Sequence, residues 1–120
     1  MMFKWKKLHD VGVHLEDQSL EEEYQRSAIG RYYYSCYAPV KKHFAKKYEP
    51  HTKKTHRLLI QELNIKGNSV EKKISKNLNQ LRNYRNNADY DDFFNKRNVK
   101  VARILSKEIH DLLKSLKKDN

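Results

Sequence analysis

The feature that most constrains this chain is the spacing of its apolar residues, which recur every three or four positions and do not alternate. This spacing places them on one face of an α-helix, whereas half-buried strands alternate. The clearest stretch is predicted to be capped by Asn95 and to end near Leu116. With three Gly and two Pro in 120 residues, the chain is also poor in the turn residues that strand-rich folds need. We therefore expect one all-α domain over residues 1–120, with five helical segments and a frayed end at 117–120.

Two further helices are predicted in the first half of the chain. One covers about Phe3–Leu15, and the next begins at a capping box of Ser19 and Glu22 and reaches about residue 47. Pro39 should kink this second helix or divide it. Gly30 costs about 1 kcal/mol relative to alanine, which close approach of another helix usually offsets. The buried positions expected in these two helices are Trp5, Leu8, Gly12, Leu15, Ile29, Tyr33, Cys36, Tyr37, Val40 and Phe44.

The remaining predicted helices follow Pro50. One spans about 52–63, and the next is capped by Asn68, with Glu71 completing a second capping box. On that helix the apolar spacing reaches Arg85 as its next inward position, before the pattern breaks at Asp89. An arginine is rarely buried without a partner, so Arg85 is the most informative local anomaly. The buried positions expected in the last three helices are Leu58, Leu59, Leu63, Val70, Ile74, Leu78, Leu81, Val101, Ile104, Leu105, Ile109, Leu112, Leu113 and Leu116.

The net charge of +11 has two interpretations that the sequence leaves open. It favours a polyanionic partner such as RNA, DNA or an acidic protein, and it equally fits a lysine-rich solubilising surface. The single cysteine, Cys36, allows no intramolecular disulfide and is expected to be a core residue of a cytoplasmic protein. No apolar run is long enough to cross a bilayer and no secretory leader is visible, so we expect no membrane association.

Several kinds of site are not supported by the sequence. None of the six histidines forms an i, i+4 pair around a glutamate and no second cysteine is present, so we expect no metal. There is no glycine-rich phosphate loop, which excludes a nucleotide-hydrolysing P-loop, and no Ser or Cys sits in a nucleophile elbow. We expect no cofactor. DNA binding ranks low, because no helix-turn-helix spacing is visible.

Four tyrosines cluster in the second predicted helix. Consecutive Tyr32, Tyr33 and Tyr34 cannot all face one core, so at least one ring should be exposed or lie at an interface. We favour packing of Tyr33 and Tyr37 inside the bundle. The alternative is stacking of RNA bases beside Arg31, as in single-strand binders.

The strongest functional candidate is the polar segment around Arg85. Arginine forks, here Arg82 and Arg85, match phosphate oxygens. Asn86 and Asn87 follow, and an asparagine at a helix end can hold backbone or a ribose hydroxyl. Asp89, four residues after Arg85, either pairs with it to fix the end of the helix or acts as a base if its pKa is raised.

Two stretches together resemble the HEPN-domain superfamily. Residues 27–37, SAIGRYYYSCY, resemble its long second helix, and residues 81–91, LRNYRNNADYD, resemble the Arg-x-x-Ala-Asp-Tyr-Asp version of its motif. That version belongs to small bacterial members often encoded beside a minimal nucleotidyltransferase. The resemblance covers about residues 5–116. It implies an antiparallel bundle of four to five helices that dimerises, with the motif helices facing each other across a basic cleft.

The resemblance also implies a function. Many members are metal-independent endoribonucleases that act as toxins or in antiviral defence, with an Arg that steadies phosphate and a His four to six residues later. Here Tyr90, beside Asp89, stands where that His is expected, and no histidine is near it in the sequence. A tyrosine that titrates near 10 is a poor base at pH 7. Whether the chain is an enzyme therefore stays open.

We expect an RNA-binding toxin or defence protein whose site comprises Arg85, Asn86, Asp89 and Tyr90, with Arg82, Asn87 and Arg31 as further RNA-binding residues. The alternative is a non-catalytic HEPN module that binds an antitoxin or nucleotidyltransferase. In that case Tyr90 is a candidate modification acceptor.

Overall fold

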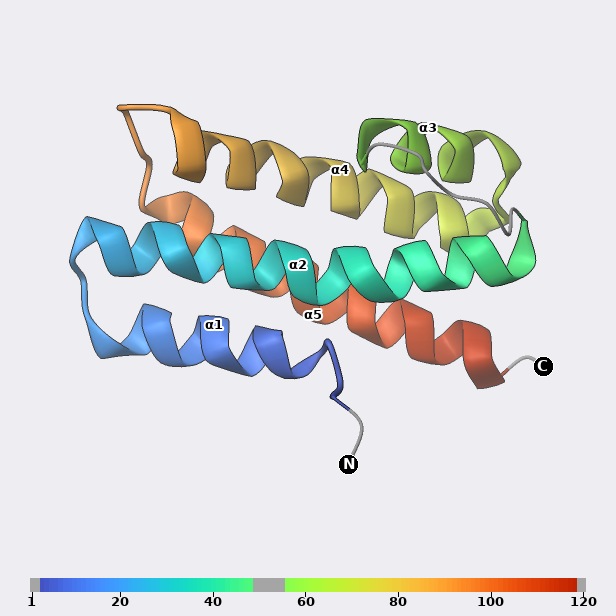
Figure 1. Ribbon diagram of the computed structural model, residues 1–120, viewed down its shortest axis with the longest axis horizontal. Coiled ribbons are helices and arrows are strands. Elements are labelled where there is room, and N and C mark those ends of the chain that lie inside the picture. The colour runs from blue at the N-terminus through green and yellow to red at the C-terminus, as the bar shows by residue number, and fades with distance from the viewer. Residues whose placement is uncertain (1–2, 49–55, 119–120) are drawn as a thin grey trace.

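The computed structural model describes residues 3–48 and 56–118, and every regular element in them is a helix (Figure 1). This confirms the predicted all-α fold with five helices. The predicted break at Pro50 and the first residues of the third predicted helix lie outside the described residues. No described helix is long and apolar enough to cross a membrane. The helices are α1 (Lys7–Gln18), α2 (Glu22–Lys47), α3 (His56–Lys66), α4 (Ser69–Tyr90) and α5 (Arg97–Lys118).

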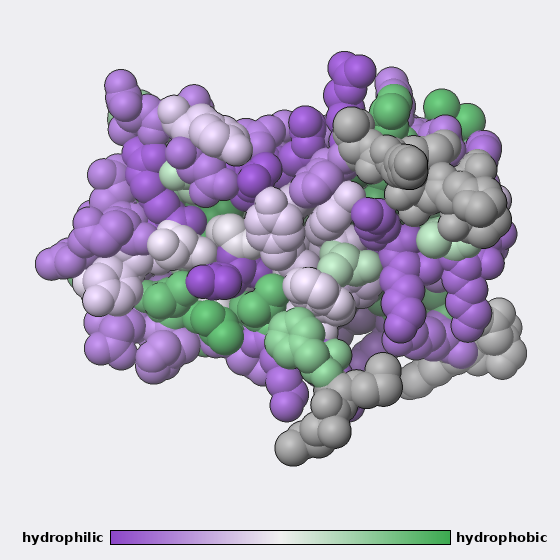
Figure 2. Space-filling model, in the orientation of Figure 1, coloured by the Kyte–Doolittle hydropathy of each residue, from purple (hydrophilic) through white to green (hydrophobic). Residues whose placement is uncertain are grey.

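Three long helices, α1, α4 and α5, pack around α2 (Figure 1). Helices α1 and α4 run antiparallel to α2, whereas α5 runs parallel to it and packs against both α2 and α4. Short α3 packs on the first half of α4 and beside the end of α2, so it leaves the last turns of α4 uncovered. The face in Figure 2 is mostly hydrophilic, with a small apolar area over α1.

Helix α2 is the centre of the core. All six apolar positions predicted for it are buried, from Ile29 to Phe44. Tyr32 is buried as well as Tyr33, because α1 covers one side of α2 while α4 covers another. Tyr34 is the half-buried ring of the cluster. Pro39 does not divide the helix, which runs through it from Glu22 to Lys47.

The start of α2 corrects one capping prediction and the start of α4 confirms the other. Ser19 does not cap α2: its hydroxyl accepts a hydrogen bond from the Glu21 backbone at 3.1 Å, and the helix begins one residue later without a side-chain cap. At α4, the Asn68 side chain accepts from the Glu71 backbone and the Glu71 side chain accepts from the Asn68 backbone, as predicted. Helix α4 then continues to Tyr90, past the predicted break.

Four residues predicted to be buried are exposed. Trp5 precedes α1 in a turn, and Leu58 faces outward because α3 packs through Leu59, Ile60 and Leu63. Helix α5 packs through small side chains, Ala102 and Ser106, that let α2 approach. This turns its outer apolar residues, Val101 and Ile104, toward solvent.

The buried Glu71 carboxylate joins the start of α4 to the end of α2. It accepts hydrogen bonds from Tyr48 at 2.5 Å and from His43 at 2.7 Å, and Lys47 lies 3.1 Å away. Burial alone would raise the pKa of Glu71, but these donors and the Asn68 backbone outweigh it and lower that pKa to about 2. The carboxylate is therefore ionised at neutral pH and holds both helices.

The close helix approach expected at Gly30 occurs at Gly12 instead. A Cβ added at Gly12 would lie 2.6 Å from the Tyr32 ring, whereas one added at Gly30 would meet nothing within 4 Å. The Tyr32 ring is fully buried and its hydroxyl donates to Glu16 at 2.6 Å, so it has little freedom to move.

The two glycines should therefore respond oppositely to the same substitution. Gly12→Ala should lower the free energy of unfolding by about 1 to 3 kcal/mol, because the new methyl group overpacks against Tyr32. Gly30→Ala should raise it by about 0.5 to 1 kcal/mol through the higher helix propensity of alanine. Urea denaturation followed by circular dichroism measures both. Equal effects at the two positions would contradict this packing of α1 on α2.

Candidate functional site

The Arg85 side chain lies on α4 at the edge of the region that α3 leaves uncovered. It is 17 % exposed, and its Nε lies 2.9 Å from Asp89 Oδ2. Its Nη1 donates to Asn86 Oδ1 at 3.3 Å and its Nη2 donates to Tyr34 OH at 2.9 Å. The i, i+4 ion pair left open by the sequence is thus present, and it is accompanied by a contact to α2 that the sequence did not indicate.

Three tyrosine rings surround the Arg85 guanidinium. Its central carbon lies 5.3 Å from the Tyr34 ring centroid and 5.8 Å from those of Tyr33 and Tyr90. Rings at this distance attract a cation through their quadrupoles. Tyr33 and Tyr34 come from the buried centre of α2, so the guanidinium is held against a rigid surface. The tyrosine cluster therefore both packs the core and frames Arg85.

A histidine from another helix lies against the same tyrosines. His56 is the first residue of α3, and its Nδ1 lies 2.5 Å from Tyr33 OH. Its ring stacks on Tyr37, with centroids 3.7 Å apart and an interplanar angle of 25°. Tyr33, which contacts the Arg85 guanidinium, thus also contacts the imidazole. No histidine lies near this segment in the sequence, but docking of α3 brings His56 to the Tyr33 ring that also faces Arg85.

The electrostatics of the site keep His56 neutral. Burial lowers its pKa below 6.5, and the positive charges of Arg85, Arg82 and Lys41 lower it further. Burial raises the pKa of Tyr33, so its hydroxyl stays protonated and can hydrogen-bond the imidazole. Among the described residues, Nε2 of His56 has no hydrogen-bond partner. This nitrogen is available to a ligand.

Arg26 of α2 fixes the end of α4. Its Nη1 donates to the carbonyl of Ala88 at 2.8 Å and to that of Asp91 at 2.7 Å, and its Nη2 donates to the carbonyl of Asp92 at 2.9 Å. The last carbonyls of a helix have no partner within the helix, so this guanidinium satisfies groups that would otherwise depend on water. Sequence reasoning missed Arg26, because no spacing rule connects α2 with residues more than 60 positions away.

The other predicted site residues are divided between the site and its surroundings. Arg82 is half-buried and close enough to His56 to lower the pKa of that histidine. The Asn87 amide is occupied locally, since it donates to Asp91 Oδ2 at 2.9 Å and to the Phe93 carbonyl at 3.0 Å. Arg31 is exposed on α2, one turn before Tyr34. Tyr90 is 74 % exposed. The described residues contain no group of three or more His, Cys, Asp or Glu side chains arranged to hold a metal ion.

Comparison with known proteins identifies one family. The model of the HEPN domain matches residues 15–118, from the end of α1 through α5. The match includes α2, α3 and α4, and therefore every residue that contacts Arg85. No curated protein and no solved structure gave a significant match.

Removal of the Arg26 guanidinium should loosen the end of α4. Arg26→Ala should lower the free energy of unfolding by about 2 kcal/mol, because hydrogen bonds from a charged donor to several carbonyls are lost. Amide hydrogen exchange should also become faster at residues 88–92. Arg97→Ala, at an exposed arginine of α5, is the matched control and should change neither quantity. If both variants are equally stable, Arg26 does not cap α4.

Proposed function

Because this chain belongs to the HEPN domain family, we propose that it is an RNA-binding toxin or defence protein that cleaves RNA without a metal ion. One observation carries the proposal: the Arg85 guanidinium and the His56 imidazole both contact Tyr33, which holds a phosphate-binding cation and a proton-transfer group in one site. These are the two groups that cleavage of a phosphodiester by its own ribose hydroxyl requires.

Arg85 and Asn86 form the phosphate-binding half of the proposed site. Arg85 presents a planar fork whose present anion is Asp89, a residue exposed enough to move aside when a phosphate arrives. The Asn86 side chain touches the same guanidinium and adds an amide donor. The uncovered last turns of α4 give a polynucleotide access to this position.

His56 replaces Asp89 and Tyr90 as the proposed proton-transfer residue. The neutral imidazole takes the proton of the ribose 2′-hydroxyl at Nε2, while Nδ1–H donates to Tyr33 OH. The 2′-oxygen then attacks phosphorus and the P–O5′ bond breaks. The leaving oxygen takes a proton from solvent, which gives a 2′,3′-cyclic phosphate and a 5′-hydroxyl. Asp89 is bound to Arg85 and Tyr90 points largely into solvent, so neither is as well placed.

A homodimer is part of the proposal. Two copies with facing α4 helices would join two sites into one basic cleft. Tyr90, beside the Arg85 guanidinium, is 74 % exposed, and Phe93, shortly after the end of α4, is 79 % exposed. Aromatic rings are enriched in contact surfaces.

The cleavage proposal predicts similar losses of RNA cleavage when the phosphate-binding residue or the proton-transfer residue is replaced. Arg85→Ala and His56→Asn should each lower RNA cleavage by about 100-fold or more while the helical circular dichroism spectrum stays unchanged. His14→Ala, at an exposed histidine of α1, should cleave like the wild type. Because the neutral imidazole is the active form and burial lowers its pKa from 6.5, the rate should be level near pH 7 and should fall only when the pH drops through the lowered pKa of His56. A chelator should have no effect.

The assay is a fluorescent single-stranded RNA at fixed salt, with purified protein at several pH values. Full cleavage by Arg85→Ala would remove the assignment of the phosphate site. Full cleavage by His56→Asn would leave binding at Arg85 intact and remove the role of His56.

A second candidate function is a non-catalytic module paired with a nucleotidyltransferase or another antitoxin. The exposure of Tyr90 favours it, because a hydroxyl on a ring that is 74 % exposed can enter the active site of a modifying enzyme. Co-expression with a nucleotidyltransferase encoded next to this gene should then add the mass of a nucleotide, and Tyr90→Phe should abolish the addition. Intact-mass spectrometry measures this, and an unmodified wild-type chain would count against the pairing.

A further inference from the structure

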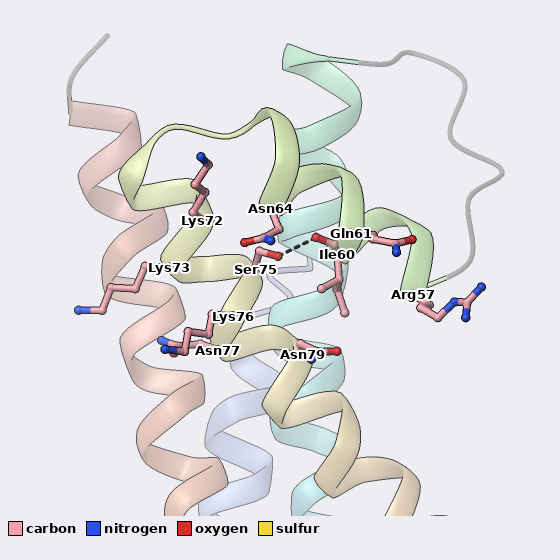
Figure 3. Close-up of a pocket in the computed structure, with 10 residues that line it drawn as sticks. All are labelled: Arg57, Ile60, Gln61, Asn64, Lys72, Lys73, Ser75, Lys76, Asn77 and Asn79. Atoms are coloured by element: carbon pink, nitrogen blue, oxygen red, sulfur yellow. Dashed lines mark hydrogen bonds between the residues drawn. The ribbon is translucent and has the colours of Figure 1, made fainter.

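A second polar surface lies between α3 and α4. It is a groove of about 880 Å³, with four cations and four amides among the residues that line it (Figure 3). Ile60 and Ser75 lie at its base, where the Ser75 hydroxyl donates to the Ile60 carbonyl at 2.6 Å. This buried contact fixes α3 to α4 and so sets the width of the groove. The cations are Arg57, Lys72, Lys73 and Lys76, and the amides are Gln61, Asn64, Asn77 and Asn79.

The protein leaves most of the positive charge of the groove unpaired. None of the residues that line it is acidic, and within the described part of the chain Arg57, Lys72 and Lys76 have no carboxylate partner. Lys73, the fourth cation of the groove, differs because it pairs with Glu108 at 3.1 Å. All three unpaired cations are exposed, so holding an anion would not require burial of a charge. The groove therefore fits an anionic ligand.

The groove leads to the candidate site. Lys72, Lys76, Asn79, Asn83 and Asn86 follow one another at spacings of four and three residues, so they share one face of α4. This face extends over about 20 Å of helix and ends at Asn86, which contacts Arg85. On α3, Arg57 directly follows His56. An anionic ligand that fills the groove could therefore extend along this face as far as Arg85, so an extended polyanion fits it best.

We propose that this groove binds the single-stranded RNA that flanks the cleaved phosphodiester. The cations take backbone phosphates, and the amides take ribose hydroxyls and base edges. A double helix is too wide for a groove between two packed helices. A protein partner is disfavoured, because the groove offers no exposed apolar anchor: its one aliphatic residue, Ile60, is buried. The inference rests on the proposed function for the place of cleavage, but binding in the groove is measurable without it.

Charge reversal tests the groove against a matched surface. The double variant Lys72→Glu/Lys76→Glu is compared with Lys107→Glu/Lys114→Glu, which makes the same change of net charge on exposed positions of α5. Both are made in the His56→Asn background, so that RNA stays intact. The probes are a labelled 12-nucleotide oligouridylate and a duplex of equal length, and binding is followed by fluorescence anisotropy from 50 to 300 mM salt.

The groove variant should bind the single strand at least about tenfold more weakly than the control variant, and its salt slope should fall by about 1.4 for two lost phosphate contacts. Equal weakening by both variants would show an effect of net charge alone and overturn the proposal. Tighter binding of the duplex than of the single strand would also overturn it. One further outcome is that the wild-type chain cleaves no RNA while the groove variant still binds the single strand more weakly than the control variant does. That result would contradict the catalytic proposal and support the binding of RNA in the groove.

Discussion

The structure depends on the burial of α2 among the other helices. A helix covered on most sides must find a partner for each polar group that it carries inward. Gln25 donates to two carbonyls at the end of α1 and just after it, those of Glu16 and Ser19, and Tyr32 donates to the Glu16 side chain. Further along, the Ser35 hydroxyl meets Ser106 and His110 of α5. These pairings fix the register of α1 and α5 on α2 more specifically than apolar contact alone would.

The same burial determines what the enclosed titratable groups do. Burial raises the pKa of Cys36 to about 11 and lowers that of His110 to about 4, so both are neutral at pH 7 and serve packing. Helix α4 is tied to α2 at both ends, by the Glu71 carboxylate near its start and by the Arg26 guanidinium at its end. Between these ties, Arg85 has little room to shift relative to Tyr33 and Tyr34.

The sequence predicts those parts of this arrangement that follow from local spacing. The helices, the Asn68–Glu71 capping box, the buried face of α2 and the inward position of Arg85 all come from intervals of three or four residues. His56 and Arg26 could not be found in this way, because each reaches the site across a helix–helix interface. Val101 and Ile104 were predicted to be buried and are exposed, for a related reason. The small residues of α5 determine which of its sides packs against α2, whereas apolar spacing in the sequence gives weight to the large apolar residues.

The way α3 is attached has a consequence for the temperature at which the protein works. This short helix carries His56 and one wall of the groove, and it is held by three buried aliphatic residues and the Ser75 contact. Arg85 and its tyrosine frame belong to the long helices and do not need it. Local opening of α3 costs less than unfolding of the bundle. On warming, the chain should therefore pass through a range in which the bundle is still folded and Arg85 is in place, but His56 is no longer held beside Tyr33. Under the proposed mechanism, the thermal limit for RNA cleavage would then lie below the melting point.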